Sequence, residues 1–189
     1  MRAAGFRVKS GFAVAAIVSG TASEWRIEFC RDVMLAPASG RFARFPFHPL
    51  VELEGEEAHA ESRAAVAAVR ATAKRELTAF FESVAAVADA GIVVGSLVDP
   101  ATISNAHIRA HASEAELFRS VIGEALDARA IRYALLREKD AYRRVAKDRG
   151  CAEGTLKADL SAHGQGSVSP WRSEQKLAVL GAAWRLSTA

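Results

Sequence analysis

The sequence predicts an α/β protein with a mixed sheet, whose elements follow in the order β-β-β-α-β-α-β-α before a terminal helix. Three observations support this prediction. Residues 56–90 repeat apolar side chains at spacings of three and four, which is typical of a long helix. Residues 92–98 form an apolar run without polar alternation, which is typical of a central parallel strand. Half of the 189 residues are hydrophobic, which is enough to build a full core.

The N-terminal part of the chain predicts a meander of strands. Residues 7–18 are small or β-branched and indicate a first strand, and residues 24–35, which partly alternate, indicate a second. The segment 19–23 between them has the length of a hairpin turn. Residues 41–48 predict a third extended segment, which we place at the sheet edge because prolines lie within and just after it.

The remaining elements follow from hydrophobic periodicity, glycine stops and helix-capping signals. Ser113 with Glu116 has the capping-box pattern, and Ser169-Pro170 has the pattern of a helix start. The predicted elements are a helix over 56–90, a strand over 92–98, a polar connection to Ser113, a helix over 113–129, a strand over 130–136, a helix over 140–149, a short helix near 156–162 and a last helix from 169.

Composition and charge narrow the classes of function. We expect a single domain over residues 1–189 with a flexible loop at 164–169. The net charge of +3 permits an anionic partner such as nucleic acid but does not require one. Cys30 and Cys151 lie far apart, which is typical of reduced thiols and predicts a cytoplasmic protein. The longest apolar runs are too short to span a membrane.

The predicted element order resembles the ribonuclease H-like superfamily, and within it the branch of Holliday-junction resolvases, over nearly the whole chain. The resemblance implies three antiparallel strands that continue into parallel strands, with helices on both faces. Nucleases of this superfamily carry carboxylates on the first strand, at the end of the first parallel strand and on the final helix. Those carboxylates hold two divalent metals, which activate water and stabilise the leaving oxygen. The cofactor of this chain stays open, with Mg²⁺ as the candidate if the chain is catalytic.

Only part of that carboxylate set carries over to this sequence. The resemblance implies that Asp99 is the second acid and that Glu174 is its counterpart on the last helix, so these two are the implied metal ligands. The first strand has no acid between Phe6 and Gly20. The resemblance therefore predicts a protein that binds nucleic acid or a nucleotide but lacks the first carboxylate of two-metal hydrolysis.

The connection after the fourth strand carries the richest cluster of polar residues. His107, Arg109 and His111 alternate with apolar residues, so an extended conformation would place three basic groups on one side. A helical conformation would instead put His107 and His111 one turn apart, with Glu114 on the same face. The capping signal at Ser113 favours the extended form.

Two functions and one structural role are open to this connection. Ligands in open α/β sheets bind beyond the carboxyl ends of the strands, so the connection predicts a patch that binds anions or handles protons. A zinc site made by His107 and His111 with Glu114 or Asp99 is an alternative. In the purely structural interpretation, the connection is a loop whose histidines contact nearby carbonyl groups.

The leading hypothesis places a ligand site at the carboxyl ends of the strands. Its alternatives are a metal-dependent hydrolase of a small molecule and a non-catalytic homodimeric scaffold, and whether the chain is an enzyme stays open. Each charged residue also has a simpler role as a strand-edge or helix-end charge. The predicted catalytic residues are Asp99 and Glu138; the predicted phosphate ligands are Lys9, His107, Arg109, His111, Arg172 and Lys176; the predicted metal ligands are Asp99 and Glu174.

Overall fold

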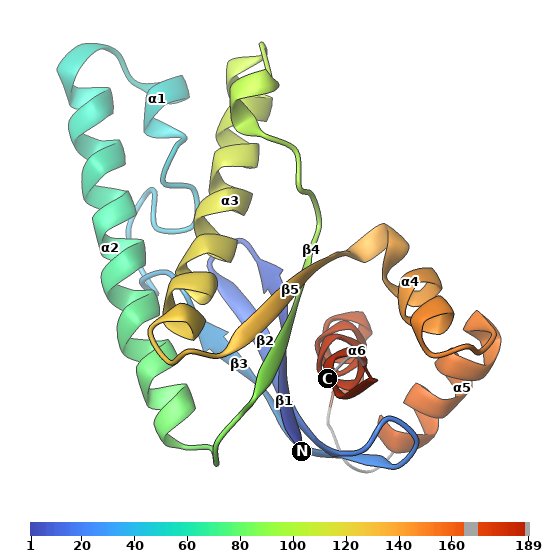
Figure 1. Ribbon diagram of the computed structural model, residues 1–189. Helices are drawn as coiled ribbons and strands as arrows, with labels where there is room; N and C mark the ends of the chain where they lie inside the picture. Colours follow the sequence, from blue (N-terminus) through green and yellow to red (C-terminus); the bar gives the residue numbers. More distant parts are fainter. Residues whose placement is uncertain (165–169, 188–189) are drawn as a thin grey trace.

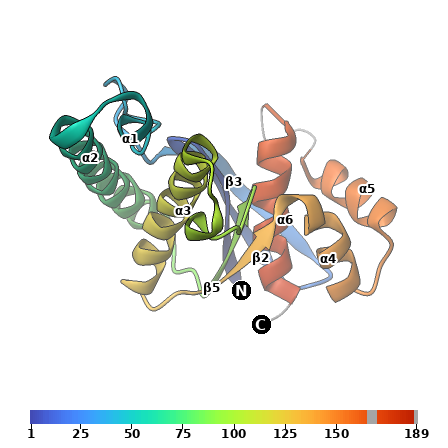
Figure 2. The same ribbon diagram turned by 90° about the horizontal axis from the view of Figure 1, so that it is seen from above.

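The computed structural model, which describes residues 1–164 and 170–187, is a three-layer α/β structure (Figures 1 and 2). A five-stranded mixed sheet forms the middle layer. Viewed from above, two long helices cover one face of the sheet and the C-terminal helices cover the other (Figure 2). The predicted α/β class and the mixed sheet are confirmed.

The sheet has the order β3-β2-β1-β4-β5. Its first three strands pair antiparallel, whereas β4 pairs parallel with β1, and β5 pairs parallel with β4. The carboxyl ends of β1, β4 and β5 therefore lie at the same edge. The strands are β1 (Arg2–Lys9), β2 (Phe12–Gly20), β3 (Trp25–Met34), β4 (Asp89–Val94) and β5 (Arg132–Arg137).

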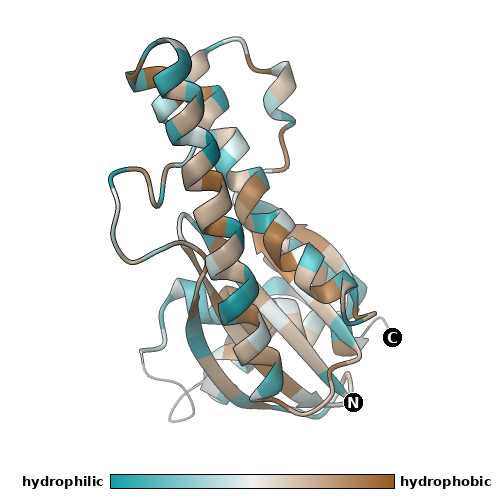
Figure 3. Ribbon diagram, turned by 90° about the vertical axis from the view of Figure 1, so that its left-hand side faces the viewer, coloured by the Kyte–Doolittle hydropathy of each residue, from teal (hydrophilic) through white to brown (hydrophobic). Residues whose placement is uncertain are grey.

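The helices form the two outer layers. Helices α2 and α3 pack on one face, and hydrophilic and hydrophobic residues alternate along α2, which faces the viewer in Figure 3. None of the described helices is long and apolar enough to cross a membrane. The helices are α1 (Pro49–Glu52), α2 (Gly55–Glu82), α3 (Ala106–Asp127), α4 (Ala141–Asp148), α5 (Glu153–Gly164) and α6 (Ser173–Ser187), with the short 3₁₀ helices η1 (Pro100–Thr102) and η2 (Glu138–Asp140).

The N-terminal meander differs from the prediction in its boundaries. The chain forms two strands over residues 2–20, and a turn at Ser10-Gly11 separates them, with Gly11 at a φ of 87°. Both strands are buried on both faces, so no alternation marks where one ends and the next begins. Residues 41–48 form turns rather than a strand. Lys9 therefore ends the first strand instead of opening it.

The boundaries of two helices were also predicted wrongly. Helix α2 ends at Glu82, well before residue 90, because the segment up to Asp89 crosses back to the sheet. Helix α3 begins at Ala106, where the side chain of Asn105 accepts a hydrogen bond from the backbone N–H of Ile108. Residues 165–169 of the predicted flexible loop, including the predicted helix start at Ser169, lie outside the described residues.

Helix α6 lies in direct backbone contact with the sheet. A Cβ atom added at Gly5 would lie 1.9 Å from the carbonyl oxygen of Ala178, and one added at Gly91 would lie 2.3 Å from that of Gly181. These distances leave no room for a side chain. Glycine at both positions lets the helix axis approach β1 and β4 more closely than ordinary packing allows.

A buried carboxylate holds the other end of the sheet, where the parallel strands β4 and β5 begin. Asp89, at the start of β4, is fully buried and forms a bidentate ion pair with Arg185 of α6 at 2.7 and 3.1 Å. Arg132 at the start of β5 adds a contact at 3.3 Å. These ion pairs tie the C-terminal end of α6 to the amino ends of the parallel strands, so Asp89 has a structural role.

We predict that Gly91→Ala destabilises the fold. The added methyl group collides with backbone atoms of Gly181, which cannot rotate away, so α6 must shift. We expect the free energy of unfolding to fall by about 1–3 kcal/mol. Urea unfolding followed by circular dichroism measures this change. Gly154→Ala in α5, where an added Cβ meets no atom within 4 Å, is the matched control and should be neutral or slightly stabilising.

Candidate functional site

A pocket of about 260 Å³ lies at the carboxyl ends of β1 and β4. The end of β1, the residues that follow β4 and one face of α3 line it. Ligands in open α/β folds bind at this edge of the sheet, so the pocket stands where the sequence predicted a site. Its lining residues are Arg7, Val8, Lys9, Ser10, Val94, Gly95, Ser96, His111, Ala115 and Phe118.

The most unusual residue of the pocket is Arg7, which the sequence-based prediction missed. Side chains alternate along a strand, so Arg7 points to the same side of the sheet as Gly5. It is only 5% exposed, and its guanidinium donates hydrogen bonds to the carboxylate of Glu138 and the carbonyl oxygen of Val8. Its Nε has no partner among the described residues. A charged residue within an apolar strand was the only signal for it in the sequence.

A second cation and carboxylate lie beside this pair. The Lys9 Nζ lies 3.9 Å from a carboxylate oxygen of Glu174, at the start of α6. The pKa of Glu174 lies below its usual value, chiefly because its own backbone N–H and the Ser173 hydroxyl donate to the carboxylate; Lys9 and Arg7 add to the effect. Two of the predicted acids, Glu138 and Glu174, are thus paired with cations.

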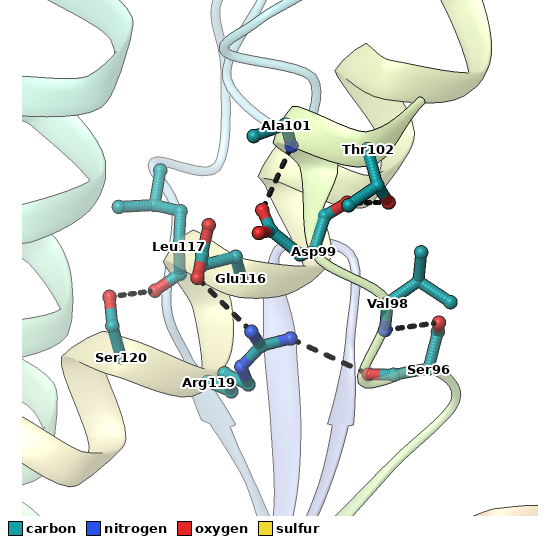
Figure 4. A network of polar contacts seen from close by, with 9 residues as sticks. All are labelled: Ser96, Val98, Asp99, Ala101, Thr102, Glu116, Leu117, Arg119 and Ser120. Atoms are coloured by element: carbon teal, nitrogen blue, oxygen red, sulfur yellow. Dashed lines mark hydrogen bonds and ion pairs between the residues drawn. The ribbon is translucent and has the colours of Figure 1, made fainter. Parts of the chain in front are cut away.

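Asp99 has a local structural role (Figure 4). Its carboxylate accepts a hydrogen bond from the backbone N–H of Ala101 at 2.9 Å and caps η1. From the neighbouring helix α3, Arg119 contacts Glu116 at 3.1 Å and donates a hydrogen bond to the carbonyl oxygen of Ser96 in this loop. Asp99 is not among the residues that line the pocket. Its predicted roles as a catalytic residue and a metal ligand stay predictions.

The predicted extended conformation of residues 107–111 is wrong. Helix α3 includes these residues, because Asn105 supplies an earlier helix cap than Ser113 does. His107 and His111 lie one turn apart, and their Nε2 atoms are 3.2 Å apart. Arg109 points elsewhere, donating to the carbonyl oxygens of Ile103 and Ser104. The structure therefore joins the two histidines and separates Arg109 from them.

A third histidine, His48, completes a cluster that the sequence did not predict. It comes from the turn before α1 and is buried. The ligand atoms of His48, His107 and His111 all lie within 4.8 Å of one another. The carboxylate of Glu114 lies next to the rings of His48 and His111. Neither Asp99 nor Glu174 belongs to such a group among the described residues. Because His48 lies 59 and 63 residues from its partners in the sequence, no local pattern could indicate it.

The start of α6 brings the predicted phosphate ligands Arg172 and Lys176 to the same edge as Lys9. Arg172 is exposed and Lys176 is half-buried. Neither side chain forms a hydrogen bond or ion pair with the described part of the chain. The neighbouring Trp171 packs against the core on the α6 face and lies close to Gly164. Its ring is therefore a packing residue rather than an open platform for a base.

Comparisons with known proteins identify the fold. No family model matches the sequence, and no curated protein matches it. The chain is similar in structure to RuvC of Thermus thermophilus, with 10% identity and a TM-score of 0.56, covering 99% of this chain and 94% of that one. A structure of T. thermophilus RuvC in complex with a Holliday junction substrate gives 10% identity and a TM-score of 0.55, covering 99% and 93%.

A third similar structure comes from yeast. The mitochondrial Holliday junction resolvase Ydc2 has 11% identity and a TM-score of 0.50, covering 98% of this chain and 78% of that one. These likenesses show that the chain has the ribonuclease H-like fold of the resolvases, as its element order predicted. The identities are low, so the likeness extends to the fold alone.

The pair of Arg7 and Glu138 yields a prediction about stability. Glu138→Gln leaves a buried guanidinium without its carboxylate, and we expect the free energy of unfolding to fall by about 1–3 kcal/mol. Arg7→Met removes the buried charge instead and leaves Glu138, which is 43% exposed, to water. We expect this loss to stay below about 1 kcal/mol. Urea unfolding of both variants compares them, and the reverse order would contradict the interpretation.

Proposed function

We propose that this chain binds nucleic acid along the carboxyl ends of its parallel strands and does not perform two-metal hydrolysis there. The observation that carries the proposal is the presence of Arg7 and Lys9 on β1. The resemblance to resolvases would place a metal-binding carboxylate on this strand. A cation at this point repels Mg²⁺ and attracts phosphate.

The carboxylates that remain support the same proposal. Glu138 neutralises the buried guanidinium of Arg7, and Glu174 lies beside Lys9. A divalent metal would have to compete with a cation already held at each carboxylate. Asp99 caps its own loop outside the pocket. These residues do not fit a centre that holds two magnesium ions, so we derive no metal-dependent step from them.

Further cations lie on the elements that begin or end at this edge of the sheet, and together with Arg7 and Lys9 they form what we call the basic edge. The side chain of Arg44 contacts the β1–β2 turn at Gly11, and Lys139 follows β5 directly. Four of them form no ion pair with a carboxylate in the described part of the chain, so their charges are available to phosphate groups: Arg44, Lys139, Arg172 and Lys176. The basic edge consists of Arg7, Lys9, Arg44, Lys139, Arg172 and Lys176.

The expected contacts follow from how exposed each cation is. Lys9, 40% exposed at its side chain, can leave its long contact with Glu174 and bind a phosphate oxygen at little cost. Arg172 and Lys176, at the start of α6, offer further charges for phosphate contact. Arg7 is too buried to bind a backbone phosphate directly, and its charge is compensated by Glu138. We therefore assign direct phosphate contact to the exposed members of the edge.

The structural likeness suggests which nucleic acid to test first. One of the similar structures is that of T. thermophilus RuvC in complex with a Holliday junction substrate. We propose four-way DNA junctions as the first ligand, with duplex and single-stranded DNA of the same sequence as comparisons. A preference among these three DNA forms would depend on the shape of the DNA, because phosphate contacts carry no sequence information.

We predict that a Lys9→Ala, Arg172→Ala, Lys176→Ala triple variant binds DNA at least tenfold more weakly than the parent chain. The logarithm of the affinity should also fall less steeply with the logarithm of salt concentration, by about one for each lost contact. Fluorescence anisotropy with labelled junction DNA over a salt series measures both quantities.

The matched control removes the same charge from another surface. Arg63→Ala, Lys74→Ala, Arg75→Ala changes three exposed cations on α2, away from the basic edge. We expect this variant to keep most of the parent affinity. Equal weakening by the two triple variants, or no salt-dependent binding by the parent chain, would contradict the proposal.

A further inference from the structure

The histidine cluster beside the pocket has the arrangement of a metal centre. The Nε2 atoms of His107 and His111 lie 3.2 Å apart, and the ligand atoms of all three rings lie within 4.8 Å. Two nitrogen ligands of one tetrahedral zinc ion are separated by about 3.3 Å, given zinc–nitrogen distances near 2.0 Å. A hydrogen bond between two imidazoles would explain one close pair of rings, but not the convergence of a third.

Glu114 supplies the second observation. The residue is 1% exposed, and one carboxylate oxygen lies 2.8 Å from the Nδ1 of His48 while the other lies 3.3 Å from the Nδ1 of His111. A carboxylate at Nδ1 holds the proton there, so that Nε2 keeps its lone pair for a metal. His48 has this hydrogen bond, and the ring of His111 lies within ion-pair distance of the same buried carboxylate.

The buried negative charge of Glu114 also supports a metal ion in this cluster. Among the described residues, its ion-pair partners are these two histidines, and no lysine or arginine reaches it. One of its oxygens has no hydrogen-bond partner in the described part of the chain. A buried carboxylate requires a compensating positive charge. A dication held by three neutral imidazoles would supply that charge within the cluster.

The cluster is built by two separate parts of the chain. His107, His111 and Glu114 lie on one face over the first three turns of α3, whereas His48 is the residue before α1. Ser62 of α2 donates a 2.8 Å hydrogen bond to the carbonyl oxygen of Pro46 and so fixes the turn that carries His48. A bound metal would link this turn to α3.

We propose that His48, His107 and His111 bind one zinc-class transition-metal ion, with Glu114 as the residue that orients His48 and His111. Three imidazoles, with no thiolate or carboxylate bound directly to the ion, suit zinc, cobalt or nickel and do not suit magnesium or calcium. Three protein ligands leave one tetrahedral position for water or for an oxygen of a ligand. His111 also lines the pocket, so the ion lies at the border of the proposed nucleic-acid site.

The test measures metal binding by the full chain without an affinity tag. We expect one Zn²⁺ per chain, with a dissociation constant below about 1 µM in competition with a chromophoric chelator. Co²⁺ should give the intense visible absorption of a tetrahedral site, and millimolar Mg²⁺ should not displace either ion. Zn²⁺ should also raise the melting temperature of the parent chain.

Variants distinguish metal binding at this site from nonspecific binding elsewhere on the chain. His107→Ala removes an exposed ligand, and we expect at least tenfold weaker zinc binding and loss of the cobalt spectrum. Glu114→Gln keeps all three ligands and should weaken binding about 10- to 100-fold. His59→Ala, which removes an exposed histidine of α2, is the control and should bind as the parent does.

Two results would overturn the assignment. One is a parent chain that takes up no zinc at micromolar concentration. The other is a His107→Ala variant that binds zinc as tightly as the parent and with the same cobalt spectrum. Both results are independent of DNA binding, so the metal site and the proposed function stand or fall separately.

Discussion

The position of α6 against the sheet is the constraint on which the rest of the structure depends. Gly5 and Gly91 remove the side chains that would hold the helix away, so its backbone rests on β1 and β4. The pair of Arg185 with Asp89 then fixes the helix along its axis. Because the helix is held in this way, its first turn lies at the carboxyl end of β1. Glu174 meets Lys9 there, and Arg172 and Lys176 extend the row of cations.

The proposed absence of two-metal hydrolysis rests on the electrostatics of that edge. A metal centre needs carboxylates that lack other partners, whereas here the carboxylates neutralise cations. The guanidinium of Arg7 is buried, so its partner Glu138 is held in place by the cost of leaving a charge unpaired. The exposed cations keep their charge available for phosphate. The fold is thus compatible with the proposed binding of nucleic acid at this edge.

The sequence predicted the architecture better than it predicted the site. Hydrophobic periodicity, glycine stops and the apolar run before Asp99 predicted the elements from α2 onward, because these signals are local. The three strands before them were drawn from partly wrong segments, since residues 7–18 belong to two strands and residues 41–48 form turns. The end of β1 was misplaced because buried strands do not alternate. The early start of α3 was missed because the cap at Asn105 is weaker as a pattern than the capping box at Ser113.

The residues that matter most in the site depend on tertiary contacts. His48 joins His107 only through the packing of the α1 turn against α3, and Arg7 is paired with a residue 131 positions away. Glu114 was recognised as a neighbour of the histidines, but its role behind the rings depends on its burial. Sequence spacing therefore indicated the right region of the fold and an incomplete set of residues.

The central claim is that this edge holds nucleic acid without cutting it. The most direct measurement incubates labelled four-way junction DNA with saturating protein and Mg²⁺, and follows both complex formation and strand integrity in the same samples. The account predicts a retarded complex that contains intact strands after long incubation. Specific incision of the bound junction, absent from samples without protein, would contradict it.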